Sequence, residues 1–501
     1  MNYTDGYTRT CGLIGNPVKH TMSPLIHNSL ASMTGINMVY VPFEVKEKEL
    51  KSAINGALAL DIHGMNVTIP YKTAVIPFLE DVDPLAKAIG AVNTLVRTEN
   101  GGFKGYNTDM TGLYHAMKDE GIELKEQTVV ILGAGGVARP TAFLCANKGA
   151  KKVYVLNRTF EKAVDVADEV NLALLNFEGD EKCADDGMSA KDCQKMCAAS
   201  GQKDDEVKDY SDKKVVPMRL EDYRQVLEAE DCFIAIQCTS VGLFPDVNSA
   251  VIEDEEFYKK VSSAMDLVYR PLQTKFLKLA ANAGARIFSG LKMLLYQGID
   301  AYELWNQDKG IKVTKEQADE IYRSMMLEVV GASNIVLEGF MGSGKSTVSE
   351  LLSEELMLEL IDTDEVIEDT EGRTINEIFE TDGETSFREM ETDLLKAIDS
   401  DHWREFVISL GGGIPVKEEN RELLRKIGKV VYLRAKPETI FERVKDDDKR
   451  PLLKTEDPLA KIEELLEMRA SLYEDVADMI IDTDGKTPME ITREIIDKLG
   501  F

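Results

Sequence analysis

The loop from Gly339 to Ser346 constrains the fold of this chain more than any other feature. It reads Gly-Phe-Met-Gly-Ser-Gly-Lys-Ser and matches the phosphate-binding pattern G-x-x-x-x-G-K-[ST] at every fixed position. The apolar run Asn334–Leu337 precedes it and an amphipathic helical pattern follows, as the pattern requires. In such a loop the amides cradle phosphates, the lysine reaches the β- and γ-phosphates, and the last hydroxyl binds Mg²⁺. We therefore expect an α/β unit that binds ATP and Mg²⁺ through Gly342, Ser343, Gly344, Lys345, Ser346 and Thr347.

A second glycine-rich loop lies far upstream. The buried-strand run Val129–Leu132 leads into Gly133-Ala134-Gly135-Gly136-Val137-Ala138, a G-x-G-x-x-A form of the dinucleotide-binding pattern. In this pattern the first glycine permits a tight turn, the second lets the backbone approach a pyrophosphate, and the alanine allows the helix to pack on the strand. A strand–turn–helix unit without a cofactor is the alternative for this motif alone.

The strand after this loop indicates which dinucleotide binds. An NAD-specific site usually has an acidic residue at the end of that strand, but here Val153–Leu156 ends in Asn157-Arg158-Thr159, with Lys162 close behind. A guanidinium suits a 2′-phosphate. We therefore expect NADP(H), bound by Gly133, Gly135, Gly136, Val137, Ala138, Asn157, Arg158, Thr159 and Lys162.

Composition limits the classes of partner. The net charge of −30 argues against nucleic acid as the main partner, because the chain has no basic footprint. No apolar run is long enough for a membrane span, the first residues lack a signal core, and seven scattered cysteines are typical of a reducing compartment. We expect a cytoplasmic protein that binds small molecules and neither nucleic acid nor membrane; its oligomeric state, monomer or homodimer, stays open.

The chain of 501 residues is long enough for about three domains. Alternating apolar runs and helical patterns predict strands at 11–14, 38–43 and 63–68 with a helix at 24–34, which is an α/β layer with a mostly parallel sheet. Residues 178–212 contain eleven acidic residues and five lysines but no Ile, Leu or Phe, so we interpret them as a solvated insertion. Cys183, Cys193 and Cys197 within it are a weak metal signal.

Several strings in the first half resemble the shikimate dehydrogenase family. They are Asn-Val-Thr-Ile-Pro-Tyr-Lys at 66–72, Gly-Ala-Val-Asn-Thr at 90–94, Gly-Tyr-Asn-Thr-Asp at 105–109, and further strings at 15–24, 266–271 and 290–297. The resemblance covers about 11–306 apart from the acidic insertion. It implies a substrate-binding domain over 1–112, to which the helices at about 291–330 return, and a Rossmann NADP-binding domain over 113–290.

The resemblance also implies roles for single residues. Lys72 and Asp109 would be the catalytic pair, because reduction of a ketone needs a proton that a lysine beside an aspartate can hold and relay. Thr21 and Ser23 would bind the substrate carboxylate, with Tyr269 near that end. The remaining expected contacts are Asn66, Thr68, Asn93 and Gln297 with the substrate hydroxyls, and Gly290 with the cofactor. Two departures from the family pattern are Thr21 in place of serine and Gln237-Cys238-Thr239 in place of Asn-Ala-Thr.

The last part of the chain is similar to shikimate kinase, over about 334–482. Asp362-Thr363-Asp364, Phe387-Arg388, Gly411-Gly412-Gly413, Arg450-Pro451-Leu452-Leu453 and Arg469-Ala470-Ser471-Leu472-Tyr473 occur in the family order. The resemblance implies a nucleoside-monophosphate-kinase-like P-loop domain over 334–501, after a linker at 331–333. Its implied roles are Mg²⁺ binding by Ser346 and Asp362, proton acceptance by Asp364, carboxylate binding by Arg388 and Arg469, close backbone approach at Gly411, Gly412 and Gly413, phosphate transfer assisted by Lys345, and a lid arginine, Arg450, on the phosphates.

Together the two resemblances imply reduction of 3-dehydroshikimate with NADPH and phosphorylation of the resulting shikimate with ATP. Phe379 and Phe387 would line the kinase substrate site or lie in the core, and Asp446-Asp447-Asp448 would face solvent. Two alternatives stay open. The first half could be a quinate or broad-specificity dehydrogenase, or the whole chain could be a catalytically silent metabolite sensor.

Overall fold

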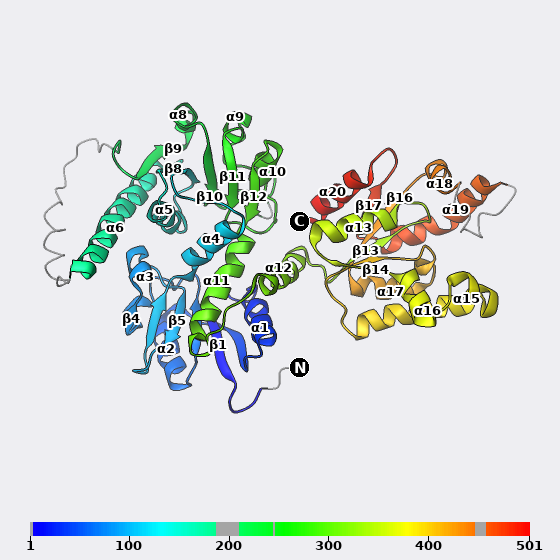
Figure 1. The fold of residues 1–501 in the computed structure, drawn as a ribbon, viewed down its shortest axis with the longest axis horizontal. Coiled ribbons are helices and arrows are strands. Elements are labelled where there is room, and N and C mark those ends of the chain that lie inside the picture. The colour runs from blue at the N-terminus through cyan, green and yellow to red at the C-terminus, as the bar shows by residue number, and fades with distance from the viewer. Residues whose placement is uncertain (1–3, 187–209, 244–245, 446–456) are drawn as a thin grey trace. The chain divides into compact units, whose positions relative to one another are not determined.

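The computed structural model describes residues 4–186, 210–243, 246–445 and 457–501. The chain divides into two units, Met1–Met325 and Met326–Phe501, each of which is described by itself (Figure 1). The division falls within helix α12 (Lys315–Val330), ahead of the expected linker at 331–333. Among the described residues, no helix has the length and apolar character needed to cross a membrane.

The first unit contains two sheets, and the first of them is mixed. Its strand order is β2-β1-β3-β5-β6-β4, with β1 parallel to β2 and β3, and β5 antiparallel to β3 and β6. The strands are β1 (Arg9–Gly15), β2 (Met38–Glu44), β3 (Gly64–Val67), β4 (Asp81–Val82), β5 (Thr94–Arg97) and β6 (Phe103–Tyr106), and the helices are α1 (Ser23–Thr34), α2 (Leu50–Ala59), α3 (Pro84–Ile89) and α4 (Thr108–Asp119).

The expectation of a mostly parallel layer is therefore correct for only part of this sheet. β5 and β6 are joined by a short turn in which Gly101 has a φ of 88° and Thr98 N donates to Gly102 O at 3.0 Å. Such a short connection forces an antiparallel pair, since parallel neighbours need a long crossover.

The second sheet of this unit is parallel throughout. Its order is β12-β11-β10-β7-β8-β9, with strands β7 (Thr128–Leu132), β8 (Lys152–Asn157), β9 (Val215–Arg219), β10 (Phe233–Gln237), β11 (Val261–Asp266) and β12 (Arg286–Ser289). Its helices are α5 (Ala138–Asn147), α6 (Phe160–Asp186), α8 (Tyr223–Ala229), α9 (Glu255–Tyr258) and α10 (Lys275–Asn282). Val129 and Ile131 belong to one buried cluster and Val130 and Leu132 to another, so both faces of the sheet are covered.

Helix α6 continues into the segment expected to be a solvated insertion at 178–212. The helix ends at Asp186, residues 187–209 lie outside the described part of the chain, and β9 begins at Val215. Cys193 and Cys197 fall outside the described residues, and the side chain of Cys183 is not described either. The solvated insertion and its weak metal signal therefore stay predictions.

Helix α11 (Gly290–Trp305) leaves the parallel sheet and packs against α4 and α1 of the mixed layer. A Cβ on Gly112 of α4 would overlap the backbone of Gln297, so this glycine allows the two helices to approach closely. Lys292 of α11 and Lys315 of α12 both pair with Asp119, at 2.7 Å and 2.5 Å. These contacts fix the side chains that α11 carries relative to the first sheet.

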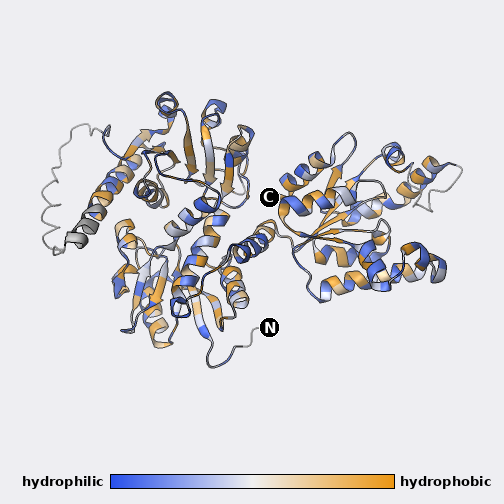
Figure 2. Ribbon diagram, in the orientation of Figure 1, coloured by the Kyte–Doolittle hydropathy of each residue, from blue (hydrophilic) through white to orange (hydrophobic). Residues whose placement is uncertain are grey.

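The second unit is a five-stranded parallel sheet covered by helices. The order is β14-β15-β13-β16-β17, with β13 (Ile335–Glu338), β14 (Glu359–Asp362), β15 (Phe406–Ser409), β16 (Lys429–Arg434) and β17 (Met479–Asp482). The helices are α13 (Lys345–Leu356), α14 (Thr363–Glu371), α15 (Ile375–Thr381), α16 (Gly383–Ser400), α17 (Glu418–Ile427), α18 (Pro437–Val444), α19 (Pro458–Val476) and α20 (Pro488–Leu499). Figure 2 shows largely apolar strands beneath helices of mixed polarity. The predicted α/β fold class is confirmed in both units.

Candidate active sites

The expected catalytic pair of the first unit is assembled in the structure. Lys72 follows β3, Asp109 lies in the first turn of α4, and Lys72 Nζ is 2.8 Å from Asp109 Oδ2. The two side chains are 31% and 19% exposed, so a bound molecule can reach them. A lysine in this position can donate a proton while the carboxylate beside it stabilises its charge.

Amide side chains form a buried cluster next to this pair. Asn93 Oδ1 accepts from Thr108 N at 2.7 Å, and Asn93 Nδ2 donates to Gln297 Oε1 at 3.5 Å. The structure thus joins Asn93 of the mixed layer to Gln297 of the returning helix α11. Polar groups held in this way can read the hydroxyls of a small polyol.

Asn66 lies in the same cluster, but its amide is fully used within the protein. Its Nδ2 donates to Asn93 O at 3.3 Å and Thr94 Oγ1 at 3.1 Å. Its Oδ1 accepts from Tyr40 Oη at 2.8 Å and lies 3.1 Å from His27 Nε2. A substrate hydroxyl would have to replace one of these bonds, so the contact predicted for Asn66 stays a prediction.

The two expected carboxylate ligands are adjacent. Thr21 Oγ1 donates to Ser23 Oγ at 3.0 Å, and Ser23 N donates to Thr21 Oγ1 at 3.2 Å. Ser23 is the first residue of α1, whose free amides favour an anion.

Thr68 is half-buried after β3, and Tyr269 follows β11, where burial raises the pKa of its phenol.

The dinucleotide loop has the shape its sequence predicts. Gly133 has a φ of 105°, and a Cβ there would lie 2.6 Å from Thr239 Cγ2. A Cβ on Gly136 would meet no atom of the described residues within 4 Å, which leaves space above the amides at the start of α5. Ala138, the first residue of α5, is fully buried. Gly290 allows close contact with the backbone oxygen of Leu267. This combination fits a pyrophosphate at the helix N-terminus.

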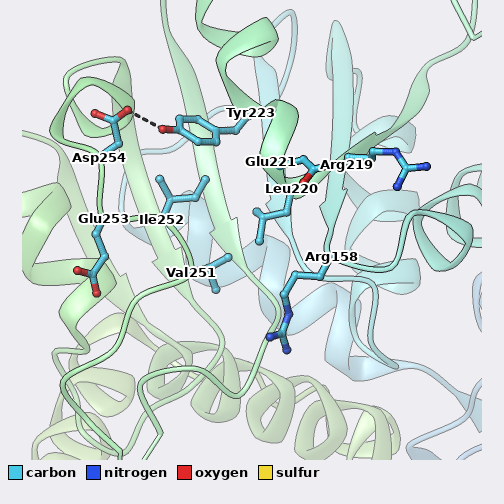
Figure 3. Close-up of a pocket in the computed structure, with 9 residues that line it drawn as sticks. All are labelled: Arg158, Arg219, Leu220, Glu221, Tyr223, Val251, Ile252, Glu253 and Asp254. Atoms are coloured by element: carbon cyan, nitrogen blue, oxygen red, sulfur yellow. Dashed lines mark hydrogen bonds between the residues drawn. The ribbon is translucent and has the colours of Figure 1, made fainter.

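The basic residues predicted to bind the cofactor line two pockets. Lys162 lies with Gly135 and Gly136 in a pocket of about 360 Å³, and Arg158 lines another of about 380 Å³ (Figure 3). Asn157 Nδ2 donates to Thr159 O at 2.8 Å, which closes the turn at the end of β8.

In the second unit, the phosphate loop wraps around its lysine. Lys345 Nζ donates to Gly339 O at 2.8 Å and to Phe340 O at 3.2 Å. Gly342 and Gly344 have φ values of 76° and 101°, Ser343 is fully buried, and Ser346 and Thr347 are exposed at the start of α13. The exposed hydroxyls can reach a metal-bound phosphate.

The expected proton acceptor of the second unit, Asp364, is half-buried. Burial and the neighbouring Asp362 raise the pKa of Asp364 to about 6, against the effect of Lys345 and Arg388. Asp362 Oδ1 caps α14 by accepting from Asp364 N at 3.0 Å. Among the described residues, Asp364 Oδ1 has no hydrogen-bond partner. The hydroxyl group of an incoming substrate could donate a hydrogen bond to this oxygen.

The two expected arginines stand around the triple-glycine loop. Arg388 Nη1 donates to both oxygens of Glu391 at 2.9 Å, and Arg469 Nη1 donates to Gly412 O at 3.5 Å. A Cβ on Gly411 would lie 2.5 Å from Asp364 Oδ1, and one on Gly413 would overlap the Arg388 guanidinium. These two glycines therefore make room for protein side chains, in addition to the expected approach of the substrate. Arg450 and Asp446–Asp448 lie outside the described residues.

Comparison with known proteins identifies the family. Residues 13–95 match the model of the shikimate dehydrogenase substrate binding domain, residues 115–185 that of shikimate / quinate 5-dehydrogenase, and residues 341–500 that of shikimate kinase. A shikimate dehydrogenase (NADP(+)) of Alkaliphilus metalliredigens is 36% identical over 311 residues, which is 62% of this chain and 96% of that protein. The chain belongs to the shikimate dehydrogenase family. Its residues 341–500 form a shikimate kinase domain, so both predicted resemblances are confirmed.

Solved structures agree for the shikimate dehydrogenase part. A shikimate dehydrogenase in complex with NADP⁺ has 32% identity and a TM-score of 0.51, covering 65% of this chain and 98% of its own. A quinate dehydrogenase from Corynebacterium glutamicum in complex with NAD has 26% identity and a TM-score of 0.51, covering 63% of this chain and 99% of its own.

Three residues that contact the two candidate sites have no functional role assigned from the sequence. His27 is fully buried, stacks on Tyr40 at 4.2 Å, and has its pKa lowered by burial to about 3, so it is neutral beside Asn66. Glu391 orients Arg388, and Arg443 of α18 donates to Gly342 O and Ser343 O at 3.3 Å and 3.1 Å. For Glu391, the spacing of three residues after Arg388 on a helix was the available signal.

Phe387 is buried in the core, and Phe379 packs on it with ring centroids 5.1 Å apart.

Proposed function

We propose that this chain reduces 3-dehydroshikimate to shikimate with NADPH and then phosphorylates shikimate to shikimate 3-phosphate with ATP. The observation that carries the proposal is the Lys72–Asp109 pair beside a buried amide cluster, on a chain whose second unit is a shikimate kinase domain. The product of the first reaction is the acceptor of the second. We assign the substrate-binding domain to 1–112 with helices from about 291–330, the NADP-binding domain to 113–290, and the kinase domain to 334–501.

In the reductase site, Lys72 gives a proton to the carbonyl oxygen while hydride adds to the carbonyl carbon. The bound dinucleotide supplies that hydride. Asp109, 2.8 Å away, stabilises the ammonium and orients it toward the substrate. Thr21 and Ser23 bind the carboxylate through their hydroxyls and the N-terminus of α1, and Asn93 and Gln297 bind the ring hydroxyls. Hydride and proton together convert C=O to CH–OH.

NADP(H) fits the parallel sheet of the first unit. The pyrophosphate would lie on the loop Gly133–Ala138, where Gly136 leaves open space, and Arg158, Thr159 and Lys162 follow at the end of β8. The relative named above as an NADP(+) enzyme and the solved NADP⁺ complex support this choice of cofactor.

In the kinase site, Asp364 accepts the proton of the attacking hydroxyl through Oδ1, which has no hydrogen-bond partner among the described residues. Arg388 and Arg469 bind the substrate carboxylate, and Lys345 binds the phosphates of ATP. Ser346 and Asp362 would hold Mg²⁺, since a hydroxyl and a carboxylate are the oxygen ligands it prefers, and the ion would neutralise phosphate charge. Arg450 would stabilise charge on the transferred phosphoryl group.

The proposal is tested by a two-step assay on the purified full chain. 3-Dehydroshikimate and NADPH are added, loss of NADPH absorbance is followed, and Mg-ATP is then added and shikimate 3-phosphate measured. Both signals are expected. NADPH oxidation without phosphate transfer would contradict the kinase assignment, and silence in both from folded protein would favour a metabolite sensor.

A quinate activity is the second candidate for the first unit. It is favoured by Thr21, whose extra methyl group lies at the carboxylate site, and by the similarity to a quinate dehydrogenase. Turnover of quinate at or above that of shikimate, with either NAD⁺ or NADP⁺, would replace the reductase proposal.

A further inference from the structure

A pocket at the carboxyl edge of the parallel sheet of the first unit is lined by two arginines. It has a volume of about 380 Å³ and contains Arg158 after β8 and Arg219 at the end of β9 (Figure 3). In the β8–β9 ladder Arg219 stands opposite Asn157. Arg219 therefore ends its strand at the same level as the Asn157-Arg158-Thr159 turn, although the sequence motif of the cofactor site does not include it.

An aromatic ring holds the guanidinium of Arg219. Its Cζ lies 5.0 Å from the centroid of Phe160, the first residue of α6. This cation–π contact limits the conformations of an otherwise exposed side chain. Since Phe160 follows directly after Thr159, the contact keeps the positive charge over the loop between β8 and α6, which is the side where a ribose 2′-substituent lies in this type of fold.

The charge of the pocket is not cancelled by its own carboxylates. In the part of the chain that the structure describes, neither Arg158 nor Arg219 has an ion pair. Of the acidic residues in the lining, Glu253 pairs with Lys275 at 2.5 Å and Asp254 with Arg224 at 3.1 Å, which leaves the exposed Glu221. In a chain of net charge −30, the two arginines in the lining make this pocket locally positive, although Figure 3 shows their side chains extending in different directions.

The rest of the lining suits a flat apolar ring. Leu220, Val251 and Ile252 provide aliphatic surface, and Tyr223 is held by its hydroxyl, which donates to Asp254 Oδ2 at 2.6 Å (Figure 3). A pocket whose lining combines apolar side chains with two arginines matches an adenosine that carries a phosphate on its ribose.

We propose that Arg219 is a second binding group for the 2′-phosphate of NADP(H), beside Arg158, and that it raises the selectivity of the first unit for NADP(H) over NAD(H). The inference rests on the cofactor site proposed above. Two guanidiniums can each donate a charge-assisted hydrogen bond to a phosphate dianion, and NAD(H) offers only a hydroxyl at that position.

The test is calorimetric titration of the full chain with 2′,5′-ADP and with 5′-AMP, two fragments that differ in the 2′-phosphate. Arg219→Met keeps the aliphatic stem and removes the charge. We expect it to weaken 2′,5′-ADP about tenfold or more and to leave 5′-AMP unchanged. Arg219→Lys should recover part of the loss, and Phe160→Leu should show a smaller loss, because it removes only the contact that orients the guanidinium.

Two controls make the result specific. Arg286→Met removes an exposed arginine from β12, at the opposite edge of the same sheet, and should change neither titration. Arg158→Met tests the cofactor site itself. If Arg158→Met weakens 2′,5′-ADP and Arg219→Met does not, the inference is wrong and the cofactor site stands. If Arg219→Met weakens both ligands equally, Arg219 contacts adenosine instead, which also overturns it. If neither arginine matters, the proposed cofactor site is wrong.

Discussion

The two sites differ in how their charges are balanced before any ligand binds. In the proposed reductase site the carboxylate of Asp109 already has Lys72 at 2.8 Å. In the kinase site, desolvation raises the pKa of the half-buried Asp364 to about 6, of the buried Glu391 to about 7 and of the buried Glu338 to about 8. The first site pairs its carboxylate with a cation. In the second, Glu391 pairs with Arg388, but Glu338 and Asp364 Oδ1 have no hydrogen-bond partner among the described residues, so a proton or an incoming cation must offset this acid.

Lys72→Ala should have the largest effect and would separate the two sites. It removes the proton donor and leaves Asp109 without its cation, so reductase activity should fall by about 10²–10⁴-fold. Kinase activity should stay unchanged. Lys345→Ala should give the reverse pattern, because it removes the phosphate-binding lysine of the other unit. Both reactions are measured on the same preparation.

The surface lysine variant Lys87→Ala is the control, since this residue is exposed on α3 and should affect neither reaction. A folded single variant that lost both activities would show that the sites are not independent.

Glu338→Gln should reveal how much the buried acidic side chain of Glu338 destabilises the kinase unit. Glu338 ends β13 directly before the phosphate loop, is fully buried, and has no hydrogen-bond partner for either oxygen among the described residues. Burial raises its pKa from 4.5 to about 8, against the effect of Lys345. The folded state therefore keeps a proton that the unfolded state has lost.

The sign of the pH dependence follows from this difference. Glu338 should lower the free energy of unfolding by about 1.4 kcal/mol for each pH unit between the two pKa values, with no cost below about pH 4.5. The Gln variant lacks this term, so its advantage over the natural chain should grow from pH 5 to pH 8. Urea unfolding followed by Trp403 fluorescence, in a Trp305→Phe background, would measure it. A constant difference would mean that Glu338 is already ionised and paired.

Gly413→Ala should weaken the carboxylate end of the kinase site. Its Cβ would displace Arg388 from Glu391, so the KM for shikimate in phosphorylation should rise about tenfold. Gly412→Ala is the matched control, because its nearest new neighbour is Gly339 O at 3.4 Å. Equal effects of the two variants would argue that backbone approach to the substrate, and not room for Arg388, explains the glycines.

The glycine loops show how far sequence reasoning reaches. Gly133–Ala138 and Gly339–Ser346 are local patterns, and each folds as strand, loop and helix as predicted. The β5–β6 hairpin was not predicted, although Asn100-Gly101 is a strong turn signal. Strand β9 was missed for a physical reason. Pro217 argues against a central strand, but β9 is an edge strand, where a missing amide donor is tolerated.

Contacts between distant segments were the part that sequence could not provide. Arg443 reaches the phosphate loop from α18, and Arg219 lines the same pocket as Arg158 because β9 lies beside β8. Likewise, the side-chain amide of Asn66 makes hydrogen bonds with Tyr40, His27 and Thr94. None of these three residues belongs to the motif 66–72 that contains Asn66. A motif fixes residue types along one segment, and packing decides which other segments complete the site.

Thr21→Ser should have the smallest effect of these variants. It would test how Thr21 contributes to binding of the substrate carboxylate in the proposed reductase site. Serine keeps the hydroxyl that donates to Ser23 Oγ at 3.0 Å, and one methyl group contributes about 0.8 kcal/mol, so KM for shikimate should change less than about fivefold. Thr21→Val keeps the shape but removes the hydroxyl, and it should raise KM about tenfold because a charged carboxylate loses a donor. Measuring both variants with shikimate and quinate separates the two roles of this side chain. A silent Val variant would exclude Thr21 as a carboxylate ligand, and a Ser variant that gained quinate turnover would show that the methyl group restricts the acid it accepts.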